Sequence, residues 1–177
     1  MVIKKALTTL CFSISLIFVA SIASSQTTAN LNLSSSVFQE GKPIPAKYTC
    51  DSSNVSPPLT WSGFPRNTKS FAIIMDDRDA PMGTWVHWVI YNIPATVNTL
   101  GEKYSIEDIK ATDGLNSWKQ EGYRGPCPPN GIHRYEFKLY ALDTNLEPTE
   151  GMTKNKLMEV MKRHILSQTV LMGTFSR

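Results

Sequence analysis

The sequence has no marked excess of charge of either sign. Its 177 residues include 18 lysines and arginines against 15 aspartates and glutamates, which gives a formal net charge of +3. No stripe of basic residues runs along any segment, whereas a surface that neutralises the phosphates of a nucleic acid needs one. We therefore expect no nucleic-acid partner.

Motifs of common hydrolases and metalloenzymes are also absent. The sequence has neither the G-x-S-x-G turn of a serine nucleophile nor the H-E-x-x-H or H-x-H spacing of a zinc site. We expect no enzymatic activity, no metal and no cofactor. A cryptic hydrolase that uses His87, His133 and Asp77 remains an alternative, because two imidazoles and a carboxylate can also support acid–base chemistry.

The one long apolar run is too short to cross a bilayer comfortably. Lys4 and Lys5 precede the run at 6–20, whereas a spanning helix needs about 20 apolar residues. Small residues follow the run, as in a cleaved secretory signal peptide, and an uncleaved anchor is the alternative. We predict a signal peptide at 1–25, a single domain at 26–177 and a periplasmic or secreted location.

Cysteine is scarce, with three residues in the chain. Cys11 lies in the predicted signal peptide, so the mature protein retains Cys50 and Cys127. In an oxidising compartment an even pair favours a disulfide bond, with two buried free thiols as the alternative.

The sequence indicates mainly short strands. The apolar run at 71–75, bounded by polar loops, is typical of a buried central strand. The segment 85–94 alternates with a period of two and is apolar on both faces, which favours the middle of a sandwich. This alternation places Trp85, His87, Val89 and Tyr91 on one face.

The second half of the chain contains longer polar segments. Residues 94–120 are predicted to form a surface excursion with a helical turn at 106–109. A helix is predicted from an N-cap at Thr153 to about Leu166, followed by a strand at 169–175.

A Gly/Pro-rich turn precedes the predicted strand at 134–142. One imidazole and one phenol, those of His133 and Tyr135, follow the turn directly and share one face of this strand. The turn is rigid and would fix their positions. The stretch predicts either a small polar site at a sheet edge or a hairpin with no binding role.

Three motifs together resemble the phosphatidylethanolamine-binding protein family, in its bacterial Raf-kinase-inhibitor-like branch. They are DRDAP at 77–81, WVHWVIYNIP at 85–94 and GPCPPNGIHRY at 125–135. They occur in the order of the family, and the resemblance covers essentially the whole predicted mature chain.

The resemblance implies a mostly β fold, an antiparallel β-sandwich with Greek-key connections plus one helix in the C-terminal region and short helical turns. It implies a non-catalytic protein that binds a small anionic or phosphorylated ligand, such as phosphate or a phospholipid head group. An alternative within the family is a protein-interaction module that inhibits a protease or another hydrolase. The matching positions that would line the pocket are Asp77, Pro81, Trp85, His87, Gly125, His133 and Tyr135.

The chemistry of these residue types suggests a role for each. Asp77 is expected to orient one of the histidines, Tyr135 to donate its hydroxyl and Gly125 to bring a backbone N–H to the ligand. Pro81 and Trp85 would form an apolar wall. Arg78 stands where many relatives have proline, so we also expect a cation near the site.

Overall fold

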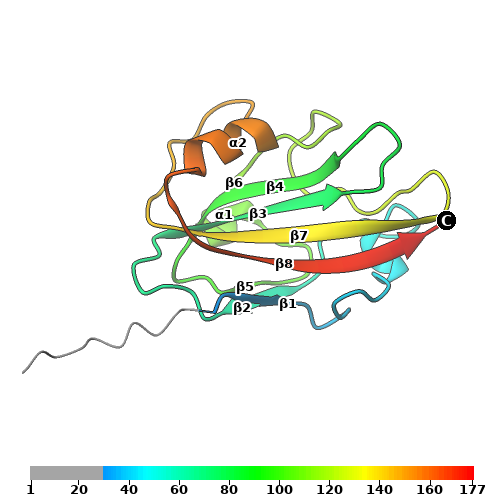
Figure 1. Cartoon of the computed structure of the whole chain (residues 1–177), viewed down its shortest axis with the longest axis horizontal. Coiled ribbons are helices and arrows are strands. Elements are labelled where there is room, and N and C mark those ends of the chain that lie inside the picture. Colours follow the sequence, from blue (N-terminus) through cyan, green and yellow to red (C-terminus); the bar gives the residue numbers. More distant parts are fainter. Residues whose placement is uncertain (1–29) are drawn as a thin grey trace, which may run out of the picture.

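The computed structural model describes residues 30–177, which form two stacked antiparallel sheets (Figure 1). The smaller sheet has the order β1 (Asn32–Ser34), β2 (Leu59–Ser62), β5 (Thr99–Leu100). The larger sheet has the order β6 (Thr112–Asp113), β4 (Trp85–Pro94), β3 (Ser70–Asp77), β7 (Ile132–Leu142), β8 (Ile165–Ser176). The predicted mostly β sandwich is confirmed, whereas the predicted signal peptide lies outside the described residues.

The helices are short. They are the 3-10 turn η1 (Ala46–Tyr48), α1 (Ile106–Ile109) and α2 (Lys154–Met161). Helix α2 packs on the outer face of the five-stranded sheet, where Leu157 and Met161 are buried with Tyr91 of β4 (Figure 1). Within residues 30–177 no helix is long and apolar enough to span a membrane.

The main hydrophobic core lies between the two sheets. Trp61 of β2 contacts Phe71 of β3 edge-on, and Trp88 and Phe137 of the neighbouring strands belong to the same buried cluster. All eight residues of β3 are buried, as expected for a central strand that is covered on both faces. Because β3 is fixed from every side, the residues at its end have well-defined positions.

The excursion after β4 is more structured than the sequence predicts. The helical turn at Ile106–Ile109 is present, but the chain also forms β5 on the smaller sheet and β6 at the edge beside β4. Each of these strands has two residues, which is too short to give an alternating pattern. The chain then passes to the other side of β3 and continues as β7.

The predicted end of the last helix is wrong. Helix α2 ends at Met161, and strand β8 begins at Ile165, which pairs with Leu142 of β7. His164 accepts a backbone hydrogen bond from Asp143 through its carbonyl oxygen, so it lies in the connection to the strand. The long ladder with β7 outweighs the helical spacing of the apolar residues beyond Met161.

The predicted faces of β4 are correct only in its first half. Along β3 the pairing partner changes from Val86 for Asp76 to Trp88 for Met75, which leaves His87 as an extra residue in a β-bulge. The bulge reverses the alternation, so that Trp88 faces the inter-sheet core while Val89 faces α2.

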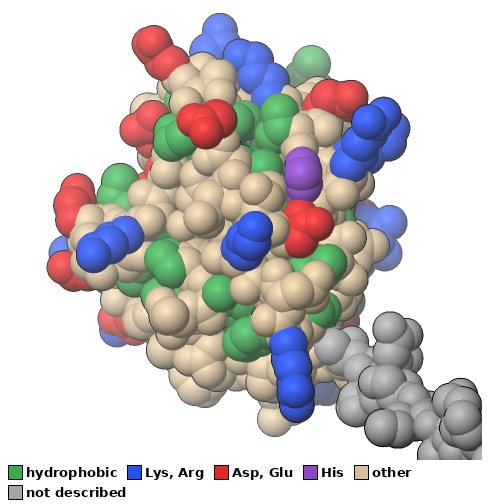
Figure 2. All heavy atoms as spheres, turned by 90° about the vertical axis from the view of Figure 1, so that its left-hand side faces the viewer, with side chains coloured by type: hydrophobic (Ala, Val, Ile, Leu, Met, Phe, Trp, Pro, Cys, Tyr) green, Lys and Arg blue, Asp and Glu red, His purple; other side chains and the backbone are tan. Residues whose placement is uncertain are grey.

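The two ends of the sandwich differ. The pocket described below lies at the end where the C-terminus is marked in Figure 1. Figure 2 views the opposite end, where basic and acidic side chains are interspersed and no patch of one sign forms. This face has no electrostatic footprint for a polyanion.

A disulfide bond joins Cys50, in the loop after η1, to Cys127, in the turn before β7. The Cα atoms are 5.4 Å apart and the two residues are separated by 77 positions. The bond ties two segments that are distant in the sequence, and both border the pocket end of the sandwich.

We expect the double substitution Cys50→Ser, Cys127→Ser to lower the free energy of unfolding by about 4 kcal/mol, because the bond removes loop-closure entropy from the unfolded chain. Urea unfolding of oxidised and reduced wild type, with the double variant as a control insensitive to reductant, measures the effect. Equal midpoints for the oxidised and reduced wild type would contradict a bond that stabilises the fold.

Candidate functional site

Three neighbouring strands bring their site residues into one row. Asp77, the last residue of β3, pairs with Trp85 at the start of β4 and with Tyr135 near the start of β7. Cross-strand partners share a face of a sheet, so these three side chains lie side by side facing the inter-sheet layer. His133 precedes Tyr135 by two residues and therefore lies on the same face.

Asp77 and His133 form a buried hydrogen-bonded pair. Asp77 Oδ2 lies 2.8 Å from His133 Nδ1, and the two residues are 4% and 7% exposed. Oδ1 of the same carboxylate accepts the backbone N–H of Asp79 at 2.9 Å. An ionised carboxylate can only accept hydrogen bonds, so Nδ1 of His133 carries its proton and Nε2 is left for the pocket.

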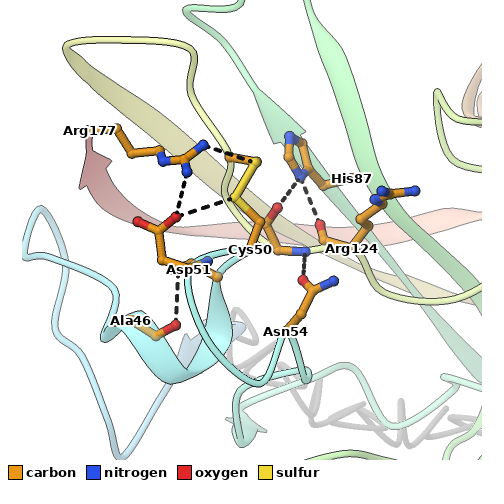
Figure 3. The surroundings of a disulfide bond; sticks show 10 residues. Ala46, Cys50, Asp51, Asn54, His87, Arg124 and Arg177 are labelled. Carbon is orange, nitrogen blue, oxygen red and sulfur yellow. Dashed lines mark hydrogen bonds and ion pairs between the residues drawn. A yellow bond between two sulfur atoms is a disulfide. The ribbon is translucent and has the colours of Figure 1, made fainter.

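His87 is oriented by backbone rather than by a carboxylate. Its Nδ1 lies 2.7 Å from the carbonyl oxygen of Arg124 and 3.1 Å from that of Gly125 (Figure 3). Both carbonyls are acceptors, so Nδ1 carries a proton here too. Burial lowers the pKa of His87, and the carbonyl contacts and the charge of Asp77 oppose this effect.

These residues border a pocket of about 320 Å³. The walls are largely apolar, and among the described residues that line the pocket the polar side chains are those of Asp77, His87 and His133. The complete lining is Asp77, Ala80, Pro81, Met82, Trp85, His87, Trp118, Cys127, Pro129 and His133. Five of the seven residues expected from the sequence are thus brought together here.

Tyr135 and Gly125 are not among the residues that line the pocket. The Tyr135 ring contacts the rings of both histidines, with centroids 5.3 Å from His87 and 6.5 Å from His133. Its hydroxyl is buried and has no hydrogen-bond partner among the described residues. Burial, together with the nearby charge of Asp77, raises the pKa of Tyr135.

The role expected for Gly125 is wrong. Its backbone N–H donates to Asn54 Oδ1 at 2.8 Å instead of facing the pocket (Figure 3). A Cβ at this position would overlap the carbonyl oxygen of Tyr48 and approach Thr49 Cα to 2.8 Å. Glycine is needed because two backbone segments meet there, and this contact positions the carbonyl that holds His87.

The cation expected near the site points away from it. Arg78 Nη1 lies 2.6 Å from Glu136 Oε1, on the face of β7 opposite to His133. Arg134 is also engaged, since it binds both carboxylate oxygens of Asp79 and lowers the pKa of that residue to about 2. The pocket wall therefore carries no lysine or arginine among the residues that the structure describes.

Sequence reasoning missed Trp118. It belongs to the polar excursion, yet its ring lies 5.0 Å from the His87 ring and 5.3 Å from the Trp85 ring, edge-on to both. A large aromatic residue isolated in a polar segment was the available signal. Neither spacing nor periodicity could have shown which face of the sandwich it joins.

Comparison with known proteins gives a consistent result. A family model described as phosphatidylethanolamine-binding protein matches residues 34–176. A UPF0098 protein of Methanothermobacter thermautotrophicus is 44% identical over 152 residues, which cover 83% of this chain and 99% of that protein.

Two solved structures are similar in fold. The crystal structure of a phosphatidylethanolamine-binding protein homologue from Chlamydia trachomatis has a TM-score of 0.80 and 42% identity, covering 84% of this chain and 99% of the other. That of E. coli YbcL, described as a member of the mammalian family, has a TM-score of 0.75 and 30% identity, covering 83% of this chain and 98% of the other.

We expect Gly125→Ala to destabilise the fold by about 1–3 kcal/mol, because backbone atoms on two segments must move apart to admit a methyl group. Chemical unfolding measures the change. Gly131→Ala, at a turn where a Cβ meets no atom within 4 Å but φ is +72°, is the control for backbone strain without overlap. Smaller destabilisation at Gly125 than at Gly131 would contradict the close approach.

Proposed function

Because this chain belongs to the phosphatidylethanolamine-binding protein family, we propose that it is a non-enzymatic protein that binds a small anionic or phosphorylated ligand in the pocket between His87 and His133. The supporting observation is that the protein engages Nδ1 of both rings and leaves Nε2 of each for a ligand. A protonated Nε2 is a charged hydrogen-bond donor, and an anion favours that state.

The charged groups that line the pocket suit a small anion that is bound by protonated histidines. No permanent cation lines the wall among the described residues, so the imidazoles must supply the positive charge. The carboxylate of Asp77 accepts hydrogen bonds from the His133 ring and from the Asp79 amide. It therefore orients the imidazole of His133. Binding therefore depends on the protonation of histidine.

A binding role is better supported than hydrolysis. The described lining offers no serine or threonine, and the sulfur of Cys127 is in the disulfide bond. No group of three or more metal-ligating side chains occurs within residues 30–177. The described lining thus provides two acid–base groups without a hydroxyl or free thiol beside them to act as a nucleophile.

The proposed setting is outside the cytoplasm, in the periplasm or the medium, as the predicted signal peptide implies. The ligand there is either free phosphate or the head group of a phospholipid, which offer the same anionic oxygens. Inhibition of a protease or another hydrolase is the alternative, and retention of full inhibition by a His133→Ala variant would favour it.

We expect sulfate, whose charge is constant in this range, to bind about 10-fold more tightly at pH 6 than at pH 8. The bound anion raises the pKa of His87 above its depressed value in the free protein. Affinity is therefore highest below the free-state pKa, itself below 6.5, and falls as the pH rises through the pKa of the complex. Isothermal titration calorimetry measures the affinity.

His87→Ala and His133→Ala should each reduce sulfate affinity, and His87→Ala should also flatten the pH dependence. His164→Ala is the matched control, since that histidine pairs with half-exposed Asp143 and does not line the pocket. Affinity that stays constant between pH 6 and 8 in the wild type would count against histidine donors.

A further inference from the structure

We infer that Trp118 is a specificity-determining residue of the His87–His133 pocket, and that it selects anions carrying an aromatic substituent over bare or alkyl-substituted anions. This inference rests on the proposed function, because it names the class of ligand for the same site. It concerns the part of the pocket that the two histidines do not fill.

The size of the pocket leaves room beyond an anion. A five-atom anion such as phosphate displaces only a few waters, on the order of 100 Å³ at ~30 Å³ for each water. The pocket measures about 320 Å³, so more than half of it remains. Apart from Asp77, His87 and His133, the lining consists of apolar residues, which include Pro81, Met82, Trp85, Trp118 and Pro129. A ligand that fills the remaining space needs an apolar group attached to its anionic group.

The two indole rings favour an aromatic group. Trp85 and Trp118 both line the pocket, and their rings lie at 84° to each other. A third ring can contact such a pair in the offset or edge-to-face arrangements that aromatic side chains prefer, whereas an alkyl chain gains only from burial. Met82, whose side chain is almost fully exposed at the rim, adds a polarizable thioether.

The backbone fixes Trp118 before any ligand arrives. Ser117 N–H donates to the Val86 carbonyl and Val86 N–H donates to Ser117 Oγ, so the excursion is joined to β4 beside His87. Buried Asn116 accepts the N–H groups of Trp118 and Gln120 through its side-chain oxygen. These bonds restrain the loop against β4.

The Trp118 side chain is also restrained. The guanidinium of Arg124 lies 4.7 Å from the centre of its ring, and Arg124 Nη1 is held by Gln120 Oε1 at 2.8 Å. The carbonyl of the same Arg124 binds His87. One residue therefore positions both the proposed anion donor and the aromatic wall, and a wall that is already ordered costs little entropy when a ligand binds.

The test compares inorganic phosphate, ethyl phosphate and phenyl phosphate at pH 6 by calorimetry. We expect the wild type to bind phenyl phosphate about 5- to 10-fold more tightly than ethyl phosphate. Trp118→Ala should reduce this preference to less than about 2-fold, and Trp118→Phe should retain most of it. Lys119→Asn is the matched control, because Lys119 is the exposed next residue of the loop and asparagine tolerates its positive φ of 59°.

The outcomes separate this inference from the proposed function. If the wild type binds inorganic phosphate but does not distinguish phenyl from ethyl phosphate, the inference fails and the proposed function stands. If Trp118→Ala and Trp118→Phe both lose all three ligands equally, Trp118 supports the fold of the pocket and does not determine specificity. If the wild type binds none of the three, both proposals fail.

Discussion

The pairing register of β3 with its two neighbours is the constraint on which the site depends. Asp77 is the last residue of β3, and it pairs with Trp85, the first residue of β4, and with Tyr135 near the start of β7. Because side chains alternate strictly along a strand, a slip of one residue in either ladder would turn Trp85 or His133 to the other face of the sheet. Burial of every residue of β3 makes such a slip costly, so the core of the sandwich protects the geometry of the pocket.

Much of the fold and part of the site could be predicted from the sequence. Apolar runs and alternation identified β3, β4 and β7, and Asp77, Trp85 and His133 do lie together at one end. What the sequence did not reveal are the features that depend on a partner strand. The β-bulge at His87 depends on the register of β4 against β3. The secondary structure of the residues from Ile165 onward depends on their pairing with β7.

The errors at the site have a common physical cause. Gly125 and Arg78 were assigned roles from what their residue types can do, but both are committed to partners elsewhere, the first to Asn54 and the second to Glu136. Trp118 could not be assigned because it reaches the pocket through a loop with no periodic pattern. A residue type limits the chemistry that is available, and the neighbours decide whether that chemistry reaches the ligand.

The arrangement of strands around β3 also has a kinetic consequence. Asp77, Trp85 and His87 belong to a β3–β4 hairpin of adjacent strands, whereas His133 arrives with β7, 56 positions after Asp77. Local pairing closes a short loop, while the β3–β7 ladder must first overcome the entropy of closing a long one. We therefore expect β3 and β4 to pair before β7 joins the sheet, so that the strand carrying His133 completes the pocket.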